Sequence, residues 1–369
     1  MSEALSKFPA EKSLVTLSRI LLLPQAVDAS AAQKLQDLRK DLLTLNRERF
    51  DDLLLLSDLN HVLIRGMNNV LEMVGHDAPC SAWAREAIAT ESARIENAVS
   101  HLGKICDAFK ERGIEVSVIK SLDHWPDLGS DLDLFSSARS EQVIDGMRTS
   151  FGAEVEARSW GDRLAGKWNF KIPGLPESVE VHVGRLGQTG EQVAIASSLL
   201  KRTRTITVGG RSFRTTSKSD RLLISTLQRM YRHFYFRLCD IIDSAALVEV
   251  DGVDFEDLRT AAKSAGIWEG TATYLAIVSD YVQKYRGHAM ALPQFVREEA
   301  RFGGEAVYYA RGFIRVPILP QSAKLYGSQL VGVLRNGEIH NGARLSLLPW
   351  LATAAVVGMK ITGSDKGIW

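Results

Sequence analysis

Apolar residues recur every three or four positions through the first part of the chain, and this spacing predicts amphipathic helices over residues 1 to about 90. The same period continues from Ala84 to Arg112, and Gly113 supplies a C-terminal stop. Just before Ala84, Pro79-Cys80-Ser81 is typical of a turn. We therefore expect an N-terminal region that consists of helices.

After Gly113 the pattern changes to short apolar runs that favour strands. The strands are expected at 115–119, 132–135, 154–160, 167–172 and 178–183, with a helix over Glu141–Phe151 among them and another near 190–200. Two β-branched runs, 203–208 and 211–216, flank Gly209-Gly210, which predicts a hairpin. This order describes a small mixed sheet.

A helical pattern returns at Ser219 and continues to about Ala310, with joints at Pro293 and Gly303-Gly304. The last sixty residues are punctuated by Gly and Pro, and an apolar stretch at Leu347–Met359 predicts a buried helix. We expect an α+β fold in which a small mixed sheet is flanked by helical regions. The expected divisions are a helical region at 1–90, an α/β core at 91–216, a helical domain at 217–310 and an extension of unknown role at 311–369.

Composition narrows the class of protein. The 369 residues carry 45 basic and 44 acidic side chains, so a dedicated nucleic-acid binder, which usually has a basic excess, is not favoured. No uncharged apolar stretch reaches the 18 to 20 or so residues of a membrane span, and the N-terminus has no secretory signal pattern. The three cysteines are far apart, which favours a reducing compartment and buried thiols. We expect a cytoplasmic protein.

Candidate chemistry lies at Ser130-Asp131-Leu132-Asp133-Leu134, where two carboxylates stand two residues apart in an apolar frame. Residues two apart in a strand point to the same side. Two adjacent carboxylates repel each other unless a cation lies between them, which is the arrangement of a divalent metal site. The alternative is a solvated strand end. The preceding Lys120-Ser121 pair and a third carboxylate, Glu180, favour an active site.

Lys120-Ser121, a nine-residue spacer and Asp131-Leu132-Asp133-Leu134 together resemble the signature of the DNA polymerase β-like nucleotidyltransferase superfamily. The bacterial stand-alone members are most similar, because they add an acidic residue in a strand like Val179-Glu180-Val181-His182. The resemblance covers residues 114–183 and extends weakly to about 258. It departs from the common pattern at Lys120-Ser121, which contains no glycine, and at Glu180, where Asp is usual.

The resemblance implies a nucleotidyltransferase core for the sheet and a nucleotide-closing role for the helical domain. Asp131, Asp133 and Glu180 would be catalytic and would hold two Mg²⁺ ions, with Mn²⁺ as an alternative. Ser121, with nearby backbone N–H groups, and Lys120 would bind the β- and γ-phosphates, and Ser130 would also lie at the nucleotide. Ser121 could equally be a helix N-cap. His182 is expected to be structural or a partner of the metal ligands, in preference to catalytic.

Further along, Arg237, Asp240 and Asp243 fall along one arc of a helix. Similar families carry such a run at the nucleotide, so Arg237 and Asp240 are predicted to bind it, whereas a plain salt-bridge ladder is the competing interpretation. The aromatic run from Met230 to Phe236 is expected to be core, with base stacking as the alternative. A basic cluster around the hairpin favours a solvated face over a phosphate site; it consists of Lys201, Arg202, Arg204, Arg211, Arg214 and Lys218.

The expected reaction is transfer of a nucleoside monophosphate from an NTP to a hydroxyl or phosphate on an unknown small-molecule acceptor, with release of pyrophosphate. Two other functions stay open. The chain could be a catalytically silent nucleotide-binding protein, since Lys120-Ser121 lacks glycine. It could also be a toxin-like enzyme that nucleotidylates a protein or an RNA. The identity of the NTP, the acceptor and the oligomeric state do not follow from the sequence.

Overall fold

The computed structural model describes residues 11–22, 29–75 and 78–354. Its helices surround a seven-stranded mixed sheet, and a second sheet has three short strands. This arrangement confirms the predicted α+β fold. Within the described residues, no helix is both long and apolar enough to cross a bilayer.

The N-terminal region is helical, as predicted. It contains α1 (Glu11–Leu22), α2 (Ala29–Leu43), α3 (Arg47–Leu59), α4 (Leu63–Val74) and the first turns of α5 (Pro79–Glu111). The turn predicted at Pro79-Cys80-Ser81 is wrong, because α5 begins there with Pro79 in its first turn. Proline suits that position, since the N–H it lacks would have no partner within the helix.

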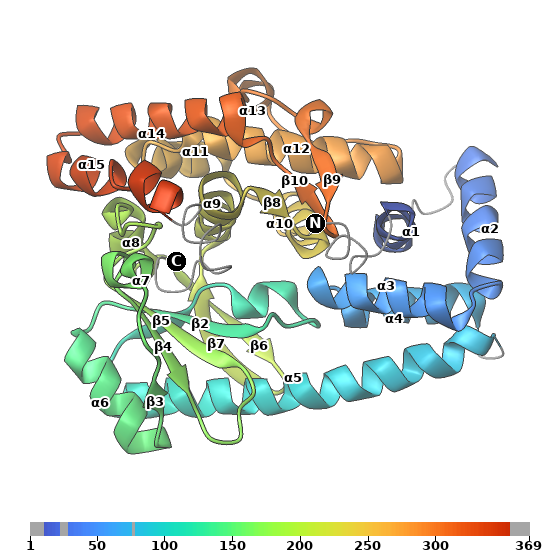
Figure 1. Cartoon of the computed structure of the whole chain (residues 1–369), viewed down its shortest axis with the longest axis horizontal. Helices are drawn as coiled ribbons and strands as arrows, with labels where there is room; N and C mark the ends of the chain where they lie inside the picture. The colour runs from blue at the N-terminus through green and yellow to red at the C-terminus, as the bar shows by residue number, and fades with distance from the viewer. Residues whose placement is uncertain (1–10, 23–28, 76–77, 355–369) are drawn as a thin grey trace.

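Helix α5 is the longest element and ties the two halves of the molecule together. Its 33 residues correspond to about 50 Å. The helix runs beneath the sheet, packs against β1 and β7, and continues to the N-terminal helices (Figure 1). The predicted division at residue 90 falls inside this continuous helix. The stop predicted after Arg112 is confirmed by Gly113, whose φ of +69° is left-handed.

The large sheet has the strand order β3-β4-β5-β2-β1-β7-β6. Its strands are β1 (Val116–Val118), β2 (Asp131–Ser136), β3 (Glu154–Val155), β4 (Lys167–Lys171), β5 (Ser178–Val183), β6 (Thr203–Val208) and β7 (Arg211–Thr216). Strands β2 and β5 are parallel neighbours in the centre of the sheet. The predicted Gly209-Gly210 hairpin is confirmed, with φ values of +55° and +73° at the two glycines.

The helices within this region are α6 (Ser140–Phe151), α7 (Trp160–Ala165) and α8 (Val193–Leu199), and the short 3₁₀ turn η2 (Ser121–His124) follows β1. The strand predicted at 154–160 is wrong beyond Val155. Trp160 instead begins α7, because the Ser159 hydroxyl accepts a hydrogen bond from the Asp162 N–H at 2.9 Å and the Asp162 carboxylate accepts from the Ser159 N–H. This reciprocal capping overrides the β-like pattern of the segment.

The C-terminal half is mostly helical, with two interruptions that the periodicity did not indicate. Its helices are α9 (Lys218–Gln228), the π-helical turn η3 (Arg229–His233), α10 (Leu238–Glu249), α11 (Phe255–Ser264), α12 (Trp268–Arg286), α13 (Gln294–Glu299), η4 (Gly304–Ala306), η5 (Ile318–Ser322), α14 (Ala323–Arg335) and α15 (Ile339–Leu345). The interruptions are strands of the small sheet, which consists of β8 (Tyr235–Phe236), β9 (Tyr308–Ala310) and β10 (Phe313–Arg315). The helical region predicted to Ala310, with joints at Pro293 and Gly303-Gly304, is therefore wrong at β8 and β9.

The helix predicted at Leu347–Met359 is described only as far as residue 354. Residues 348–354 are helical but largely exposed, and Trp350 has 76% of its surface accessible. The expected burial is therefore wrong for this part, and the remainder of the segment lies outside the described residues.

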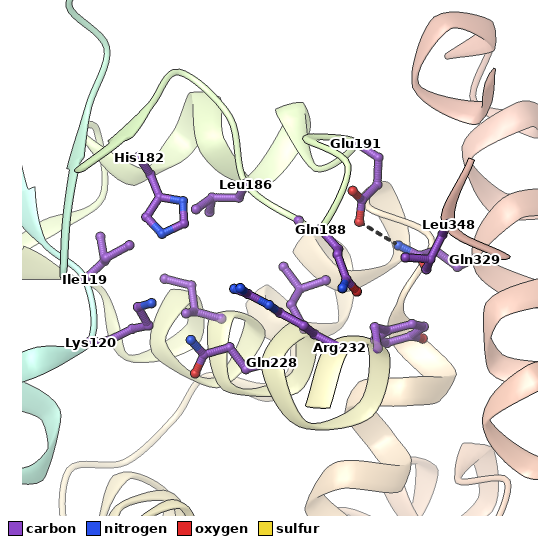
Figure 2. Close-up of a pocket in the computed structure, with 14 residues that line it drawn as sticks. Ile119, Lys120, His182, Leu186, Gln188, Glu191, Gln228, Arg232, Gln329 and Leu348 are labelled. Carbon is purple, nitrogen blue, oxygen red and sulfur yellow. Dashed lines mark hydrogen bonds between the residues drawn. The ribbon is translucent and has the colours of Figure 1, made fainter. Parts of the chain in front are cut away.

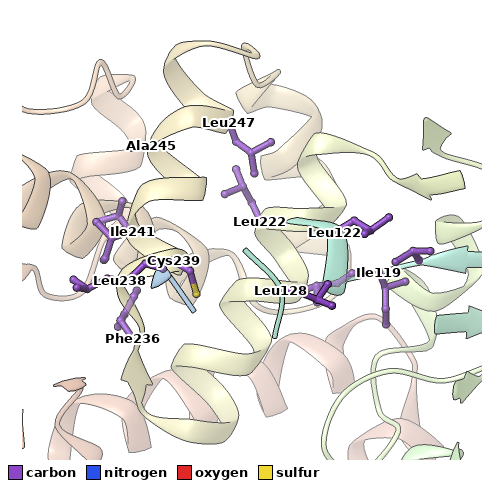
Figure 3. Packing of buried hydrophobic residues seen from close by; sticks show 14 of the residues in the cluster. Ile119, Leu122, Leu128, Leu222, Phe236, Leu238, Cys239, Ile241, Ala245 and Leu247 are labelled. Carbon is purple, nitrogen blue, oxygen red and sulfur yellow. The ribbon is translucent and has the colours of Figure 1, made fainter. Parts of the chain in front are cut away.

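One continuous cluster of buried apolar side chains extends from α1 to α14. Figure 3 shows the part in which the segment after β1 meets α9 and α10, with Leu122 and Leu128 near Leu222 and Cys239. Full burial of a leucine contributes about 1.5–3 kcal/mol to the free energy of unfolding. The apolar core therefore holds the sheet and the C-terminal helices in fixed relative positions.

A buried ionic network adds to this junction. The Arg65 guanidinium on α4 contacts the Asp127 carboxylate at 2.7 Å and the Asp243 carboxylate on α10 at 2.6 Å. Asp243 also accepts from Nδ1 of His124 at 2.5 Å, and the Cys239 sulfur lies 3.8 Å from Nε2 of the same ring. Arg65 and His124 lower the pKa of Asp243 against the effect of burial, which would raise it. Helix α4, residues 124–127 and helix α10 are far apart in sequence and are thus joined by one network of ion pairs.

We expect Arg65→Met to reduce the free energy of unfolding by about 3–5 kcal/mol, because Asp127 loses its buried counter-ion and Asp243 keeps only His124. Urea denaturation followed by circular dichroism measures this loss. Arg47→Met is the matched control, since the Arg47–Asp51 pair has side chains that are 55% and 50% exposed. Such a pair contributes about 0.5 kcal/mol. Equal effects of the two substitutions would contradict the structural role of Arg65.

Candidate functional site

Two carboxylates face each other across the central strands of the sheet. Asp133 on β2 is in register with Glu180 on β5, so their side chains leave the same face side by side. The intervening valines and leucines point to the other face, and Leu132, Leu134, Val179 and Val181 are fully buried. The alternation of apolar and acidic residues in each strand thus both anchors the strands and presents the acids.

Ser121 fixes the position of Asp133. Its hydroxyl accepts a hydrogen bond from the Asp133 N–H at 2.6 Å and donates to the Asp131 carbonyl at 3.1 Å. The side chain is buried, with 2% of its surface exposed. The sequence predicts this hydroxyl on a phosphate or at a helix N-cap, but its described partners are both on β2. In the structure, Ser121 therefore fixes the backbone of β2, the strand that carries Asp131 and Asp133, through two hydrogen bonds.

Two lysines neutralise the acid pair. The Lys120 ammonium contacts the Asp133 carboxylate and lies 3.4 Å from Glu180. Lys167 on β4 lies 2.8 Å from the other Glu180 oxygen and 3.0 Å from Asp162. Burial alone would lower the pKa of Lys120, but Asp133 and Glu180 raise it above its usual value. Lys120 thus supplies positive charge between the carboxylates, whereas the sequence prediction has it on a phosphate.

His182 extends the acid pair on one side. Its Nε2 lies 2.6 Å from Glu180, whereas its Nδ1 is buried without a hydrogen-bond partner among the described residues. Burial lowers the pKa of His182, although Glu180 acts in the opposite direction, so the ring is neutral. Since a carboxylate accepts hydrogen bonds, the ring proton belongs on Nε2 and Nδ1 carries a lone pair. His182 therefore holds Glu180 with one nitrogen and has an acceptor to spare.

The two acids have opposite protonation tendencies. Burial and the charge of Glu180 raise the pKa of Asp133 to about 7, although Lys120 opposes the shift. Burial would also raise the pKa of Glu180, but Lys120, His182 and Lys167 together bring it well below its usual value. Glu180 is therefore the permanent anion of the pair, and Asp133 is the acid that a nearby cation would keep ionised.

The donor set fits a divalent cation. Asp133, Glu180 and His182 have possible ligand atoms within 4.8 Å of one another. His182 donates a hydrogen bond from Nε2 to Glu180 and so orients this ligand, which leaves the carboxylates of Asp133 and Glu180 as the metal-binding groups. Carboxylate oxygens suit Mg²⁺ and Mn²⁺. Asp131, one of the three predicted ligands, lies outside this compact group at the exposed start of β2. Binding of an ion between Asp133 and Glu180 requires the Lys120 ammonium to move aside.

The acids open onto a polar cleft that leaves about 800 Å³ free of protein atoms. Asp131, Asp133 and Glu180 form its acidic side, and five cationic side chains also line it: Lys120, Lys167, Arg229, Arg232 and Arg237. Among the described residues, neither Arg232 nor Arg237 has a carboxylate within ion-pair distance. The polar cleft therefore has an excess of positive charge and two guanidinium groups with unused donors.

A π-helical turn positions the arginines. Turn η3 widens the end of α9 over Arg229–His233, and Phe234 then adopts a left-handed φ of +54° before β8 begins. Such turns and left-handed non-glycine residues are costly and often occur at functional sites. Here they bring Arg229, Arg232 and His233 to the polar cleft opposite the acids.

The predicted nucleotide-binding residues are only partly brought together. Lys120, Ser121, Ser130 and Arg237 all line the polar cleft. Asp240 does not, because its carboxylate binds Arg229 at 2.7 Å and accepts the Arg237 backbone N–H at 2.7 Å. Asp240 thus holds two residues that line the polar cleft, Arg229 and Arg237, without lining it itself. The predicted ladder among Arg237, Asp240 and Asp243 is also absent, since each of the two carboxylates binds an arginine from another element.

Sequence reasoning missed Lys167, Arg229 and Arg232. Lys167 is one residue of a predicted strand and has no motif around it. The two arginines lie beside or within the aromatic run, for which only core packing or base stacking is predicted. Of that run, Met230 and Phe236 are fully buried core, as expected, whereas Tyr235 is half-buried and lines the polar cleft. Three of the six residues of the hairpin cluster contact carboxylates: Arg202 pairs with Asp257, Arg204 with Asp251 and Arg214 with Glu115.

No protein-family model matches this chain, and no curated protein matches it significantly. The functional argument therefore depends on the geometry of the site and on the sequence signature.

We expect Ser121→Ala to lower the free energy of unfolding by about 1–3 kcal/mol, because the Asp133 N–H loses its acceptor in a buried setting. Urea denaturation of the ligand-free protein measures the change. Ser137→Ala is the control, since Ser137 is an exposed serine just beyond β2. Unchanged stability of Ser121→Ala, combined with weaker nucleotide binding, would instead support the phosphate role.

We expect Asp133→Asn to become progressively more stable than the natural protein as the pH rises from about 5 to 8 in the presence of EDTA. The pKa of Asp133 is raised on folding, so its contribution to stability is present at low pH and is lost as the pH rises through about 7. The asparagine side chain cannot ionise and avoids this loss. Urea denaturation at both pH values measures the difference, with Asp41→Asn at an exposed site as the control. A pH-independent difference would contradict the shift.

Proposed function

We propose that the protein is a metal-dependent nucleotidyltransferase that transfers a nucleoside monophosphate from an NTP to a hydroxyl or phosphate acceptor and releases pyrophosphate. The observation that supports this most strongly is the register of Asp133 and Glu180 on adjacent strands, opposite arginines that have no carboxylate partner. A buried acid pair needs cations, and free guanidinium groups need an anion. A nucleoside triphosphate with its metal ions satisfies both requirements at once.

Asp133 and Glu180, with Asp131 at the start of β2, would hold the Mg²⁺ or Mn²⁺ ions. Bound there, the ions would supply positive charge that offsets the charge of the triphosphate and of the developing pyrophosphate. Ser121 keeps β2, and with it Asp133, in a fixed position, while Lys167 and His182 orient Glu180. The protein thus provides a preorganised acidic face.

Arg232 and Arg237 would bind the phosphates from the opposite side of the polar cleft. Their planar guanidinium groups can each make two hydrogen bonds to phosphate oxygens. Lys120 also lines the polar cleft, so its ammonium group would contact the phosphates when a metal ion occupies the space between the acids. Three arginine guanidinium groups lie near the ring of Tyr235. Tyr235 is the aromatic side chain best placed to contact the base.

A second candidate, a catalytically silent nucleotide-binding protein, is favoured by one observation. Lys120 and Lys167 already neutralise Asp133 and Glu180, so the pair is stable without a metal ion. If the lysines permanently replace the metal, the nucleotide would bind equally well with and without Mg²⁺. Calorimetry with a non-hydrolysable ATP analogue, with Mg²⁺ and with EDTA, together with an assay of pyrophosphate release, separates the two functions.

We expect Asp131→Ala and Asp133→Ala to reduce Mg²⁺-dependent pyrophosphate release by at least about 100-fold, because each removes a carboxylate from the metal-binding face. The assay uses labelled NTPs with a fractionated cell extract as the source of acceptors, and circular dichroism checks the fold. Asp41→Ala, at an exposed carboxylate on α2, is the control and should retain full activity. Retained activity in either site variant would refute the proposed function.

A further inference from the structure

A second hollow, here called the apolar cavity, adjoins the polar cleft and leaves about 550 Å³ free of protein atoms. Aliphatic side chains form much of its wall: Ile119, Leu186, Ile224, Leu227 and Leu348. They come from the end of β1, the loop after β5, helix α9 and the C-terminal segment. The last segment, which had no predicted role, thus closes one side of this space.

The apolar cavity joins the polar cleft beside the acid pair. Lys120, Gln228 and Arg232 line both spaces. In Figure 2, Lys120 and His182 lie at one end of the cavity, Arg232 and Gln188 lie in the middle, and Glu191 and Gln329 lie at the other end. A molecule in the apolar cavity would therefore have one end next to Glu180 and its cations.

Each end of the apolar cavity has a buried polar side-chain atom without a hydrogen-bond partner among the described residues. At the acid pair, Nδ1 of His182 has no partner among the described residues, and 6% of the residue surface is exposed. At the far end, Oε1 of Gln329 is likewise unpartnered in the described structure, with 1% exposed, and its amide nitrogen is 3.5 Å from Glu191. Buried polar atoms without partners are unfavourable, so a ligand with donors at both ends would satisfy them.

The lining distinguishes the apolar cavity from a nucleobase site. Bases are commonly held against aromatic rings, and Tyr235 and His233 provide such rings in the polar cleft. The apolar cavity has one tyrosine ring, Tyr231, beside its five aliphatic side chains, and only two of the five cations that line the polar cleft reach it. Such walls suit a saturated or small aromatic body of modest size. The nucleotide therefore fits the polar cleft better, and the cavity is left for a second molecule.

We propose that the apolar cavity is the acceptor site, and that it takes a small, elongated molecule with an apolar body, a hydroxyl at the end beside the acid pair and a hydroxyl or amine at the other end. The inference rests on the proposed nucleotidyl transfer, since it assigns the second substrate of that reaction. The hydroxyl at the His182 end would form a hydrogen bond with Nδ1 and lie at the junction with the polar cleft. The other end would donate to Gln329 or Glu191.

Filling the apolar cavity tests the proposal. Gln188 is half-buried and has no hydrogen bond from its side chain among the described residues, so Gln188→Trp should fill the space with little effect on folding. The probes are tyramine and 1,4-cyclohexanedimethanol, measured by ligand-observed NMR. We expect at least one probe to bind the natural protein and to bind Gln188→Trp at least 10-fold more weakly. Gln33→Trp, at an exposed site on α2, is the matched control and should bind the probe normally.

Adenosine and uridine form the second arm of the test. Their binding should be unaffected by Gln188→Trp, and selective loss of nucleoside binding would overturn the proposal in favour of a base pocket. Failure of both probes to bind, or equal binding to Gln188→Trp, would also overturn it. Calorimetry with a non-hydrolysable ATP analogue and Mg²⁺ separates the two hypotheses. Probe binding without nucleotide binding would refute the nucleotidyltransferase, whereas nucleotide binding without probe binding would refute the acceptor site alone.

Discussion

The site depends on the electrostatic compensation of two carboxylates that the sheet forces together. Asp133 and Glu180 are in register on parallel strands and are both largely buried, so each would be expelled or protonated without counter-charge. Lys120 and Lys167 provide that counter-charge, and His182 donates a hydrogen bond to Glu180. The two lysines also set the difference between the pair, because both lie beside Glu180 whereas only Lys120 contacts Asp133, whose pKa stays raised.

The surrounding structure serves to keep this arrangement rigid. Ser121 clamps β2 at the acids, and Asp240 holds Arg229 at the opposite side of the polar cleft. Arg65 connects the N-terminal helices to Asp127 and to Asp243 on α10. The acidic face and the cationic wall thus belong to different elements, yet buried ion pairs and one continuous core fix their separation. Such preorganisation is what positioning and electrostatic stabilisation require.

Two adjoining spaces with different chemistry follow from this arrangement. The polar cleft is lined by most of the charged side chains, whereas the apolar cavity is lined by five aliphatic side chains and Tyr231 and has unpartnered polar atoms at its ends. Their junction at Lys120 and Arg232 lies beside the acid pair. A two-substrate transfer reaction needs such a division, because the charged donor and a less polar acceptor must meet at one point. The C-terminal segment contributes Gln329 and Leu348 to the second space, which gives the extension a structural role.

By itself, the sequence determined the features that depend on neighbouring residues. Helical periodicity predicted the N-terminal helices, Gly209-Gly210 predicted the hairpin, and the two-residue spacing put Asp131 and Asp133 on one side of a strand. Tertiary structure decided which side chains from distant segments meet. The pairing of Asp133 with Glu180 depends on strand register, and the approach of Lys167 depends on β4 lying beside β5. Arg232 reaches the polar cleft only through the π-helical turn, and Ser121 is clamped to β2 only because β1 and β2 pair. Local patterns carry no information on these contacts, since register and helix packing are set by burial over the whole core.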